Sequence, residues 1–220
     1  MKAIVCERPN RLAVIDQAVP IRQAGEVTVR IRRVGLCGTD FHIFSGNQPF
    51  LNYPRVMGHE LAGEVEAAYA GSVFTPGQRD TINPYLPCGG CIACRKSKPN
   101  CCVNSRVMGV HIDGGMTEFV CVPEEAVIDV EGLSLDQAAM VEFLSIGAHA
   151  VRRADLSKGE RVLVVGAGPI GISAALFARF ADAEVSLIDM STSRLDYART
   201  MLGFPHVATV GEGLAEWLDR

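Results

Sequence analysis

Residues 161–171 read Arg-Val-Leu-Val-Val-Gly-Ala-Gly-Pro-Ile-Gly, and this stretch decides the fold of the C-terminal part of the chain. The apolar run predicts a strand, and the residues after its first glycines predict the start of a helix. In such a G-x-G-x-x-G turn, glycines allow a tight bend, close approach of the backbone to a pyrophosphate, and close packing of helix on strand. The N-terminus of the helix favours the phosphate charge. The stretch therefore predicts a dinucleotide-binding loop with the candidate contacts Gly166, Gly168, Pro169, Ile170 and Gly171.

An acidic residue stands at the end of the next predicted strand. Asp189 follows Gly171 by 18 residues, close to the spacing of about 20 expected for a carboxylate that binds the adenosine ribose. A carboxylate there accepts hydrogen bonds from the ribose hydroxyls and repels a 2′-phosphate. The first arginine after it is Arg194, which we expect to border the cofactor. The sequence thus predicts NAD rather than NADP, the alternative being that Asp189 only caps the strand.

The residues around the loop alternate between strand and helix. Buried strands are predicted at Arg161–Val165 and Glu184–Asp189, and helices at Pro169–Phe180 and Ser191–Met201. This order indicates a parallel sheet with crossover helices. The uncharged stretch 162–178 reaches the lower limit of a membrane span, but its glycines and proline would break a helix in lipid. We therefore expect no membrane segment.

The first 150 residues show a different pattern, with short strands separated by turn residues. Residues Val27–Val34 alternate apolar with polar side chains, as a half-buried strand does. Similar runs occur at Ala3–Cys6, Ala62–Ala67 and Glu118–Val122, and a helix is predicted after the N-cap candidate Ser134. We expect two domains, residues 1–150 and 151–220, with the boundary near residues 150–158.

Composition and charge narrow the classes of function. Hydrophobic residues make up 48% of the 220 residues and charged residues 21%, as in a globular protein. The net charge is −4 and the 21 basic residues are scattered, so no nucleic-acid partner is expected. The N-terminus carries no recognisable signal peptide. Eight cysteines then indicate a reducing compartment, and we expect a cytoplasmic protein in which cysteines bind metal or take part in catalysis.

Four closely spaced cysteines form the most specific local motif. Thiolates at these separations can close a tetrahedron around zinc without an open position, which predicts a structural site. The candidate ligands are Cys88, Cys91, Cys94 and Cys102. By spacing alone Cys101 could replace Cys102, and the alternative to a metal site is a loop with free cysteines. Cys6 and Cys121 stand in strand-like runs and are expected to be small core residues.

A second set of metal-ligating residues is spread along the chain. One thiolate, one imidazole and two carboxylates make up the mixed set of catalytic zinc sites that keep an exchangeable position. They are Cys37, His59, Glu60 and Glu142. Each has a simpler interpretation, because a single histidine is more often a core or surface residue and Glu142 could be a solvated helix charge.

Polar residues next to this set suggest supporting roles. Asp40 could accept a hydrogen bond from His59 and fix its tautomer. Thr39 and His42 could pass a proton from a metal-bound hydroxyl to solvent.

In this order the motifs resemble those of the zinc-dependent medium-chain dehydrogenases/reductases, the zinc alcohol dehydrogenase family. The resemblance spans nearly the whole chain. It implies an α/β protein with a GroES-like, β-rich catalytic domain followed by a Rossmann dinucleotide-binding domain. It also implies two zinc ions per chain, one catalytic and one structural. Carried over by position, the catalytic ligands are Cys37, His59, Glu60 and Glu142.

Further motifs place the resemblance within one branch of the family. Glutamate at position 142 resembles the polyol and threonine dehydrogenases, in which Glu60 and Glu142 exchange as ligands. The sequence is similar to sugar-acid dehydrogenases of the L-galactonate or L-gulonate 5-dehydrogenase kind in Gly46–Phe50, Tyr53–Val56 and Met108–Gly115.

The implied activity is hydride transfer from a secondary alcohol of a small polyol or sugar acid to NAD. Zinc would bind the substrate hydroxyl, and Thr39 and His42 would carry its proton away. His111 would contact a sugar carboxylate or be a plain loop residue. The family habit implies a homodimer or homotetramer. The alternatives are a threonine- or sorbitol-type dehydrogenase, a catalytically silent dinucleotide-binding member, and a zinc-ribbon interaction module, which the acidic charge balance disfavours.

Two features depart from the family. The chain stops after two strand–helix units, and a half-sheet ending there would expose a long apolar edge, so we expect a truncated chain. Gln78–Ile82 stands where the family usually carries Gly-Asp-Arg-Val, which puts Asp80 at an expected core position of a strand. A buried carboxylate is costly unless it is paired. Either Arg79 pairs with Asp80 or the side chain faces solvent.

Overall fold

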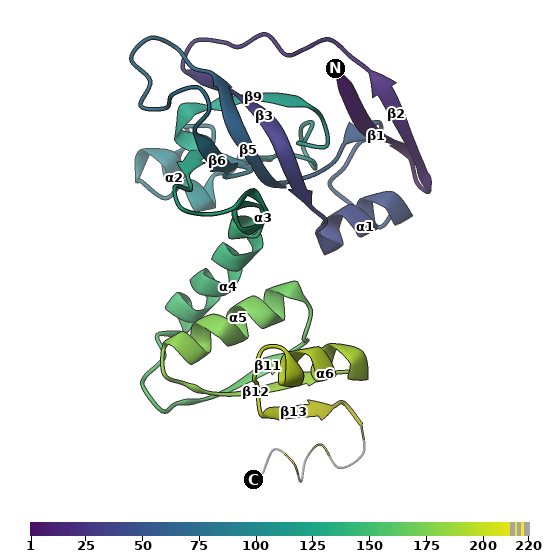
Figure 1. Cartoon of the computed structure of the whole chain (residues 1–220), viewed down its shortest axis with the longest axis vertical. Coiled ribbons are helices and arrows are strands. Elements are labelled where there is room, and N and C mark those ends of the chain that lie inside the picture. The colour runs from purple at the N-terminus through teal and green to yellow at the C-terminus, as the bar shows by residue number, and fades with distance from the viewer. Residues whose placement is uncertain (212–213, 215–216, 218–220) are drawn as a thin grey trace. The chain divides into compact units, whose positions relative to one another are not determined.

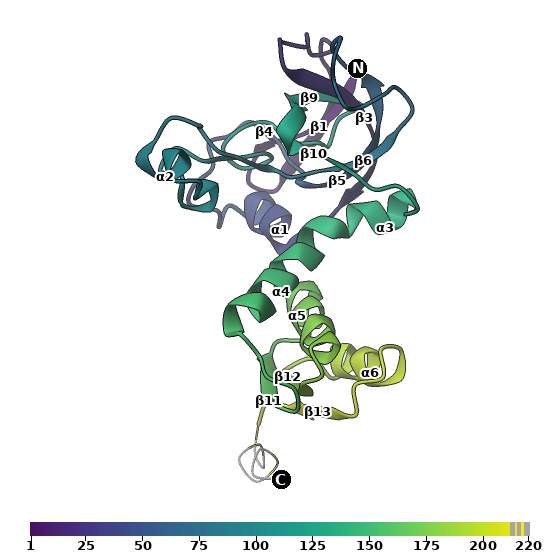
Figure 2. The same cartoon turned by 90° about the vertical axis from the view of Figure 1, so that its left-hand side faces the viewer.

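The computed structural model describes residues 1–211, 214 and 217, and it divides into two compact units (Figures 1 and 2). Residues Met1–Glu142 form the first unit and Phe143–Arg220 the second. The first two residues of the helix α4, Val141–Ala154, belong to the first unit and the others to the second. The units are described separately below.

A five-stranded antiparallel sheet forms the centre of the first unit (Figure 1). Its order is β10-β6-β5-β3-β9, with the bounds β3 Glu26–Gly35, β5 Glu60–Ala67, β6 Arg79–Ile82, β9 Phe119–Pro123 and β10 Val127–Asp129. Val27 and Val29 of β3 are fully buried in the core, as the predicted alternation requires, but Thr28 between them is buried as well. The alternation predicted for this strand is therefore confirmed only for its apolar positions.

Smaller elements complete the first unit. A second sheet has the order β2-β1-β4, with β1 Lys2–Arg8, β2 Arg11–Asp16 and β4 Arg55–Val56. A two-stranded ribbon pairs β7 Tyr85–Leu86 with β8 Arg106–Val107. The helices are α1 Gly38–Ser45, α2 Ile92–Arg95 and α3 Leu135–Ala139, and the 3-10 helices are η1 Pro99–Cys101 and η2 Glu124–Ala126.

The N-cap predicted for α3 is confirmed. The Ser134 hydroxyl accepts a hydrogen bond from the Gln137 backbone N–H at 3.2 Å. The Gln137 side chain accepts one in return from the Ser134 backbone N–H at 2.9 Å. This reciprocal pair satisfies two of the N–H groups that a helix start leaves without partners.

The second unit contains a three-stranded parallel sheet in the order β11-β12-β13. The strands are β11 Arg161–Val165, β12 Glu184–Asp189 and β13 His206–Thr209, and α5 Pro169–Phe180 and α6 Thr192–Thr200 connect them. The bounds predicted for β11, α5 and β12 are confirmed. The strand β13 was not predicted, because His206–Thr209 has too few apolar side chains to indicate a strand.

The expectation that β11 is a buried strand is wrong for this chain. In the described sheet β11 pairs only with β12 and forms an edge. The side chains of Leu163 and Val165 are consequently exposed, by 43% and 74%.

Asp80 is buried without a pairing partner, which neither expected arrangement anticipates. Its side chain has no accessible surface, so it does not face solvent. Arg79 turns away and donates a hydrogen bond to the backbone oxygen of Leu133. Among the described residues neither carboxylate oxygen of Asp80 has a hydrogen-bond partner. Burial, and then the charge of Glu64, raises the pKa of Asp80 to about 7.

Among the residues that the structure describes, no helix combines the length and apolar character needed to cross a membrane.

Candidate functional site

Three of the residues assigned to the mixed metal site meet in the first unit. One ligand atom from each of Cys37, His59 and Glu60 lies within 4.8 Å of the other two. Cys37 directly precedes α1, and His59 and Glu60 stand at the start of β5, where both are buried. A thiolate, an imidazole and a carboxylate at these separations could together hold one divalent metal ion.

A glycine makes room for the carboxylate of this group. Gly35, at the end of β3, pairs with Glu60 across the antiparallel sheet. A Cβ atom added to Gly35 would lie 2.8 Å from the Cβ atom and 3.2 Å from the Cδ atom of Glu60. Such contacts are closer than real side chains allow, so the position of the Glu60 carboxylate depends on a residue without a side chain at 35.

Asp40 ties together the two segments that carry the ligands. Its buried carboxylate accepts a hydrogen bond from the Cys37 backbone N–H at 2.9 Å and from the Gly58 backbone N–H at 3.3 Å. Among the described residues the expected hydrogen bond from His59 to Asp40 is not formed, since Nδ1 of His59 has no partner and the ring contacts Cys37 instead. Asp40 affects His59 through its charge.

His59 is linked to Cys37 through one of its two ring nitrogens. Burial lowers the pKa of His59, but the hydrogen bond to Cys37 and the charge of Asp40 outweigh it, so the net shift is upward. Within the described part of the chain, Nδ1 has no hydrogen-bond partner, so the contact with Cys37 uses the other ring nitrogen, Nε2. A thiolate, an imidazole nitrogen directed at it and a carboxylate are donors that zinc accepts, so the donor set fits a zinc ion.

Glu142 lies beside the group of three without joining it. The Tyr85 hydroxyl donates a hydrogen bond to Glu142 Oε1 at 3.0 Å. Burial raises the pKa of Glu60, and the charge of Glu142 raises it further. Burial, followed by the charge and hydrogen bond of Glu142, also raises the pKa of Tyr85. Sequence reasoning missed Tyr85, since a single tyrosine ahead of a cysteine cluster resembles any strand residue.

The two residues proposed to carry a proton lie on α1. Thr39 stands in the first turn of the helix and is half-buried, whereas His42 lies three residues later and is exposed. Residues three apart on a helix are neighbours on one face. The helix therefore places Thr39 nearer the protein interior and His42 in contact with solvent.

The four cysteines of the predicted structural site also meet. One sulfur atom from each of Cys88, Cys91, Cys94 and Cys102 lies within 4.8 Å of the others. The Cys88 backbone N–H donates a hydrogen bond to the Cys102 sulfur at 3.3 Å. Backbone hydrogen bonds from Cys94 and then Val103 lower the pKa of Cys91 to about 6, which favours the thiolate that a metal requires. These four thiols fit a closed tetrahedral zinc site.

Cys101, the alternative that spacing left open, is not part of this group. It is exposed, and its sulfur accepts a hydrogen bond from the Asn100 side chain at 3.4 Å. Of the two cysteines expected in the core, Cys6 is buried and Cys121 is half-buried.

The glycine-rich loop of the second unit has the expected open geometry. Gly166 has a φ of +103°, which side chains rarely adopt, and a Cβ atom there would meet no atom within 4 Å. A Cβ atom on Gly171 would lie 2.9 Å from the carbonyl carbon of Gly166, so only glycine lets α5 start this close to β11. Pro169 and Ile170 begin α5, and the proline costs no hydrogen bond there because the first N–H groups of a helix have no partner within it. The loop fits the pyrophosphate of a dinucleotide.

Asp189 ends β12, as predicted, and forms a hydrogen bond to the glycine-rich loop. Its carboxylate accepts hydrogen bonds from the backbone N–H groups of Ala167 and Ser191, each at 2.7 Å. The Arg194 guanidinium lies 3.7 Å from the same carboxylate. The hydrogen bond from Ser191 is the main reason that the pKa of Asp189 lies below its ordinary value. Asp189 is therefore an anion at neutral pH.

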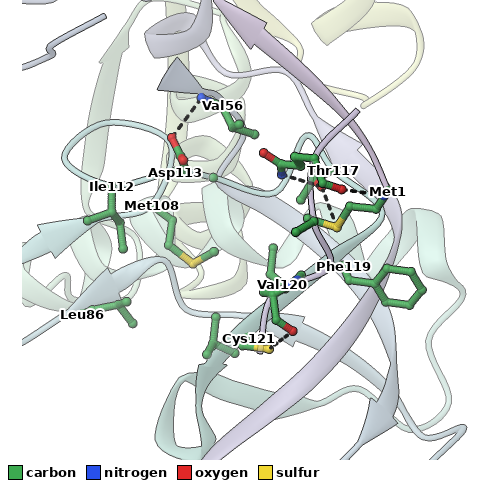
Figure 3. Close-up of a pocket in the computed structure, with 15 residues that line it drawn as sticks. Met1, Val56, Leu86, Met108, Ile112, Asp113, Thr117, Phe119, Val120 and Cys121 are labelled. Atoms are coloured by element: carbon green, nitrogen blue, oxygen red, sulfur yellow. Dashed lines mark hydrogen bonds between the residues drawn. The ribbon is translucent and has the colours of Figure 1, made fainter. Parts of the chain in front are cut away.

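A pocket of about 280 Å³ lies elsewhere in the first unit (Figure 3). None of the candidate metal ligands lines it. Figure 3 shows that its polar groups are engaged, with Asp113 accepting a hydrogen bond from the Val56 backbone N–H at 3.1 Å. His111, next to this pocket in sequence, uses its Nδ1 atom to accept a hydrogen bond from the Val107 backbone N–H at 3.1 Å. This contact corresponds to the simpler expectation for His111.

The chain is similar to known dehydrogenases in sequence and structure. Residues 23–132, half of the chain, match the family model of the alcohol dehydrogenase GroES-like domain. The chain is 41% identical over 206 residues to L-galactonate-5-dehydrogenase of Escherichia coli strain K12, covering 93% of this chain and 61% of that protein. It is 36% identical over 225 residues to an L-threonine 3-dehydrogenase of Rhizobium etli, covering 98% of this chain and 64% of that protein.

A solved structure extends the similarity to the fold. It is described as a short chain alcohol dehydrogenase from E. coli CFT073 complexed with the cofactor NADH. The TM-score is 0.91 at 34% identity, and the match covers 100% of this chain and 65% of the other. The chain thus spans less than two thirds of the length of each of these three proteins.

Proposed function

The chain belongs to the alcohol dehydrogenase family that carries a GroES-like domain, and from this premise we propose that it oxidises a secondary alcohol of a small polyol or sugar acid with zinc and NAD. The resemblance and the fold class inferred from the sequence are confirmed at the level of the family. The activity, the substrate and the roles of single residues are parts of the proposal.

The observation that carries the proposal is the group formed by Cys37, His59 and Glu60, whose ligand atoms lie within 4.8 Å of one another. Bound there, zinc would act as a Lewis acid on the substrate hydroxyl. The chain's own residues hold the three ligands at the start of α1 and β5 and leave a position for substrate. The Thr39 hydroxyl would take up the substrate's proton, and His42 would release it to solvent. The four cysteines around Cys91 would hold the second, structural zinc ion.

The glycine-rich loop and Asp189 would bind NAD, whose nicotinamide accepts the hydride. The open space above Gly166 suits the pyrophosphate, and the Asp189 carboxylate suits the ribose hydroxyls. A negative charge at this point disfavours the 2′-phosphate of NADP.

The relatives support the substrate class. A sugar-acid dehydrogenase at 41% identity favours an aldonate, and the threonine dehydrogenase at 36% makes an amino alcohol the second candidate. The eight free cysteines support a reducing compartment such as the cytoplasm, and we retain a homodimer or homotetramer as part of the proposal.

NAD reduction by the purified protein over a panel of substrates tests this function. The panel contains L-galactonate, L-gulonate, sorbitol and L-threonine, and Cys37→Ser serves as the matched inactive variant. We expect reduction with an aldonate or polyol that disappears in Cys37→Ser. Binding of NADH without turnover of any substrate would instead favour a catalytically silent member, and turnover that survives in Cys37→Ser would contradict the proposed metal centre.

A further inference from the structure

Two carboxylates border the candidate metal centre, and the structure treats them differently. Glu60 lies within 4.8 Å of the Cys37 and His59 ligand atoms. The Glu142 carboxylate accepts the Tyr85 hydroxyl hydrogen bond at 3.0 Å and does not belong to that group. The family resemblance leaves open which of the two carboxylates binds the metal, and the contact with Tyr85 supplies a physical reason for a choice.

We propose that Tyr85 is a positioning residue that holds Glu142 outside the ligand set, so that Glu60 is the carboxylate ligand and one position stays open to substrate. This inference rests on the proposed function, because it concerns the same metal centre. Tyr85 acts through Glu142 and is not itself a ligand.

The backbone of Tyr85 is held in place by two contacts. Tyr85 begins β7 and pairs with Val107 of β8. Its backbone N–H also donates a hydrogen bond to the Asn83 side chain at 3.1 Å. A tyrosine hydroxyl is protonated at neutral pH even at its ordinary pKa, so it can donate a hydrogen bond to a carboxylate throughout that range. The hydrogen bond therefore restrains Glu142 from a residue whose own backbone is held by pairing with β8 and by the Asn83 side chain.

The charges at the centre favour a single carboxylate ligand. One thiolate and one carboxylate balance the two positive charges of zinc, whereas a second carboxylate would leave a net negative centre. A closed, anionic centre would accept the oxygen of a substrate alcohol poorly, since a catalytic zinc needs an exchangeable position. Glu60 is the better placed ligand, because a carboxylate oxygen of Glu60 lies within 4.8 Å of the Cys37 and His59 ligand atoms, whereas Glu142, although also buried, is not in that group.

Cobalt binding to the 220-residue chain tests the inference without measuring activity. Co²⁺ would replace zinc, and the absorption of the Cys37 centre would be taken as the difference from a Cys37→Ser variant. A chelator competition then gives the affinity of this centre. The variants are Glu60→Gln, Glu142→Gln, Tyr85→Phe, the double variant Tyr85→Phe/Glu60→Gln, and the triple variant that adds Glu142→Gln.

We expect Glu60→Gln to lower the cobalt affinity by about 10- to 100-fold, and Glu142→Gln to change it by less than about threefold. Adding Tyr85→Phe to Glu60→Gln should recover at least about tenfold, because the released Glu142 takes the vacant place. The recovery should vanish in the triple variant. A tyrosine with only a structural role would give no such rescue.

Three results would overturn the inference. They are a double variant that binds cobalt as weakly as Glu60→Gln, a recovery that persists in the triple variant, and an equal loss in Glu60→Gln and Glu142→Gln. The last comparison decides the matter even if Tyr85→Phe does not fold. Absence of any Cys37-dependent cobalt absorption in the unmutated chain would instead refute the metal centre and with it the proposed function.

Discussion

The Asp189 carboxylate accepts a hydrogen bond from the backbone N–H of Ala167 at 2.7 Å, so the end of β12 is fastened to the glycine-rich loop. One side chain therefore has two tasks in the proposed cofactor site. It shapes the loop from within, and it presents a negative charge where the adenosine ribose would lie. The two tasks can be separated by experiment.

The first prediction concerns cofactor choice. The unmutated protein should bind NADH more tightly than NADPH, and Asp189→Ser should narrow that ratio by about 5- to 150-fold, or roughly 1–3 kcal/mol. Fluorescence titrations with both cofactors measure the ratio. Arg194 lies close enough to meet a 2′-phosphate, so Asp189→Ser/Arg194→Ala should lose the gain in NADPH binding. If Asp189→Ser weakened the binding of NADH and NADPH equally, Asp189 would serve only to hold the glycine-rich loop. Equal affinity of the unmutated protein for the two cofactors would contradict the assignment of Asp189 to the ribose.

The second prediction separates the two metal clusters. Metal analysis should give close to two zinc ions per chain. Cys91→Ser should lower the yield or the melting temperature, because a closed zinc site contributes free energy of folding. Cys37→Ser should lose one zinc ion and keep the fold, as judged by circular dichroism. Similar behaviour of the two variants would argue against one structural and one catalytic centre.

The third prediction follows from Gly35. A methyl group at this position collides with Glu60, so Gly35→Ala should weaken metal binding at the Cys37 centre by about tenfold or more while the four-cysteine cluster keeps its zinc. Gly38→Ala is a matched control only three residues away, since a Cβ atom there meets no atom within 4 Å. Zinc content after dialysis against a weak chelator gives the comparison. Equal zinc loss in the two variants would show that the space at Gly35 does not matter.

The fourth prediction concerns the pH dependence of stability. The unfolded chain releases the Asp80 proton near pH 3.8, whereas the folded protein keeps it up to about pH 7. The folded state therefore binds more protons in this window, and the free energy of unfolding should fall as the pH rises through it. The pKa difference of Asp80 between the folded and the unfolded state corresponds to about 4 kcal/mol of stability. Above about pH 7 this contribution to the free energy of unfolding is lost.

Asp80→Val should remove this contribution and raise the free energy of unfolding at pH 8, as measured by urea denaturation between pH 4 and pH 8. Asp129→Val is the control, because Asp129 is the exposed cross-strand neighbour of Asp80 and should keep the decline. A valine variant that is less stable than the unmutated protein at pH 8 would show that the buried carboxylate has a partner after all.

The sequence predicts those parts of the fold in which local pattern and tertiary packing agree. The bounds of β11 and α5 follow from an apolar run and a glycine turn, and the structure places them at the same residues. The strand β13 was not predicted, because it forms through pairing with β12 and its composition gives no strand pattern. The burial of Asp80 was likewise not predictable, since a carboxylate in a strand is ordinarily expected to be paired or to face water.

For the candidate site, residue type and order chose the four cysteines and the group of Cys37, His59 and Glu60 that the structure brings together, and also Glu142, which lies outside that group. Spacing could not decide between Cys101 and Cys102, because the two are adjacent. Cys101 ends η1 and Cys102 follows it, and only the path of the chain there shows which sulfur reaches the other three. Nor could spacing show that Tyr85 contacts Glu142, 57 residues away. Contacts of this kind depend on the whole arrangement of strands and are visible only in three dimensions.

Asp40 also joins two segments that lie far apart in the sequence. Its carboxylate bridges the backbone just before α1 to the backbone just before β5, and these two segments deliver the thiolate and the imidazole. The two donors are thus held in register by an internal anion. A single buried anion, which is not one of the three grouped ligands, therefore sets the spacing between the segments that carry the thiolate and the imidazole.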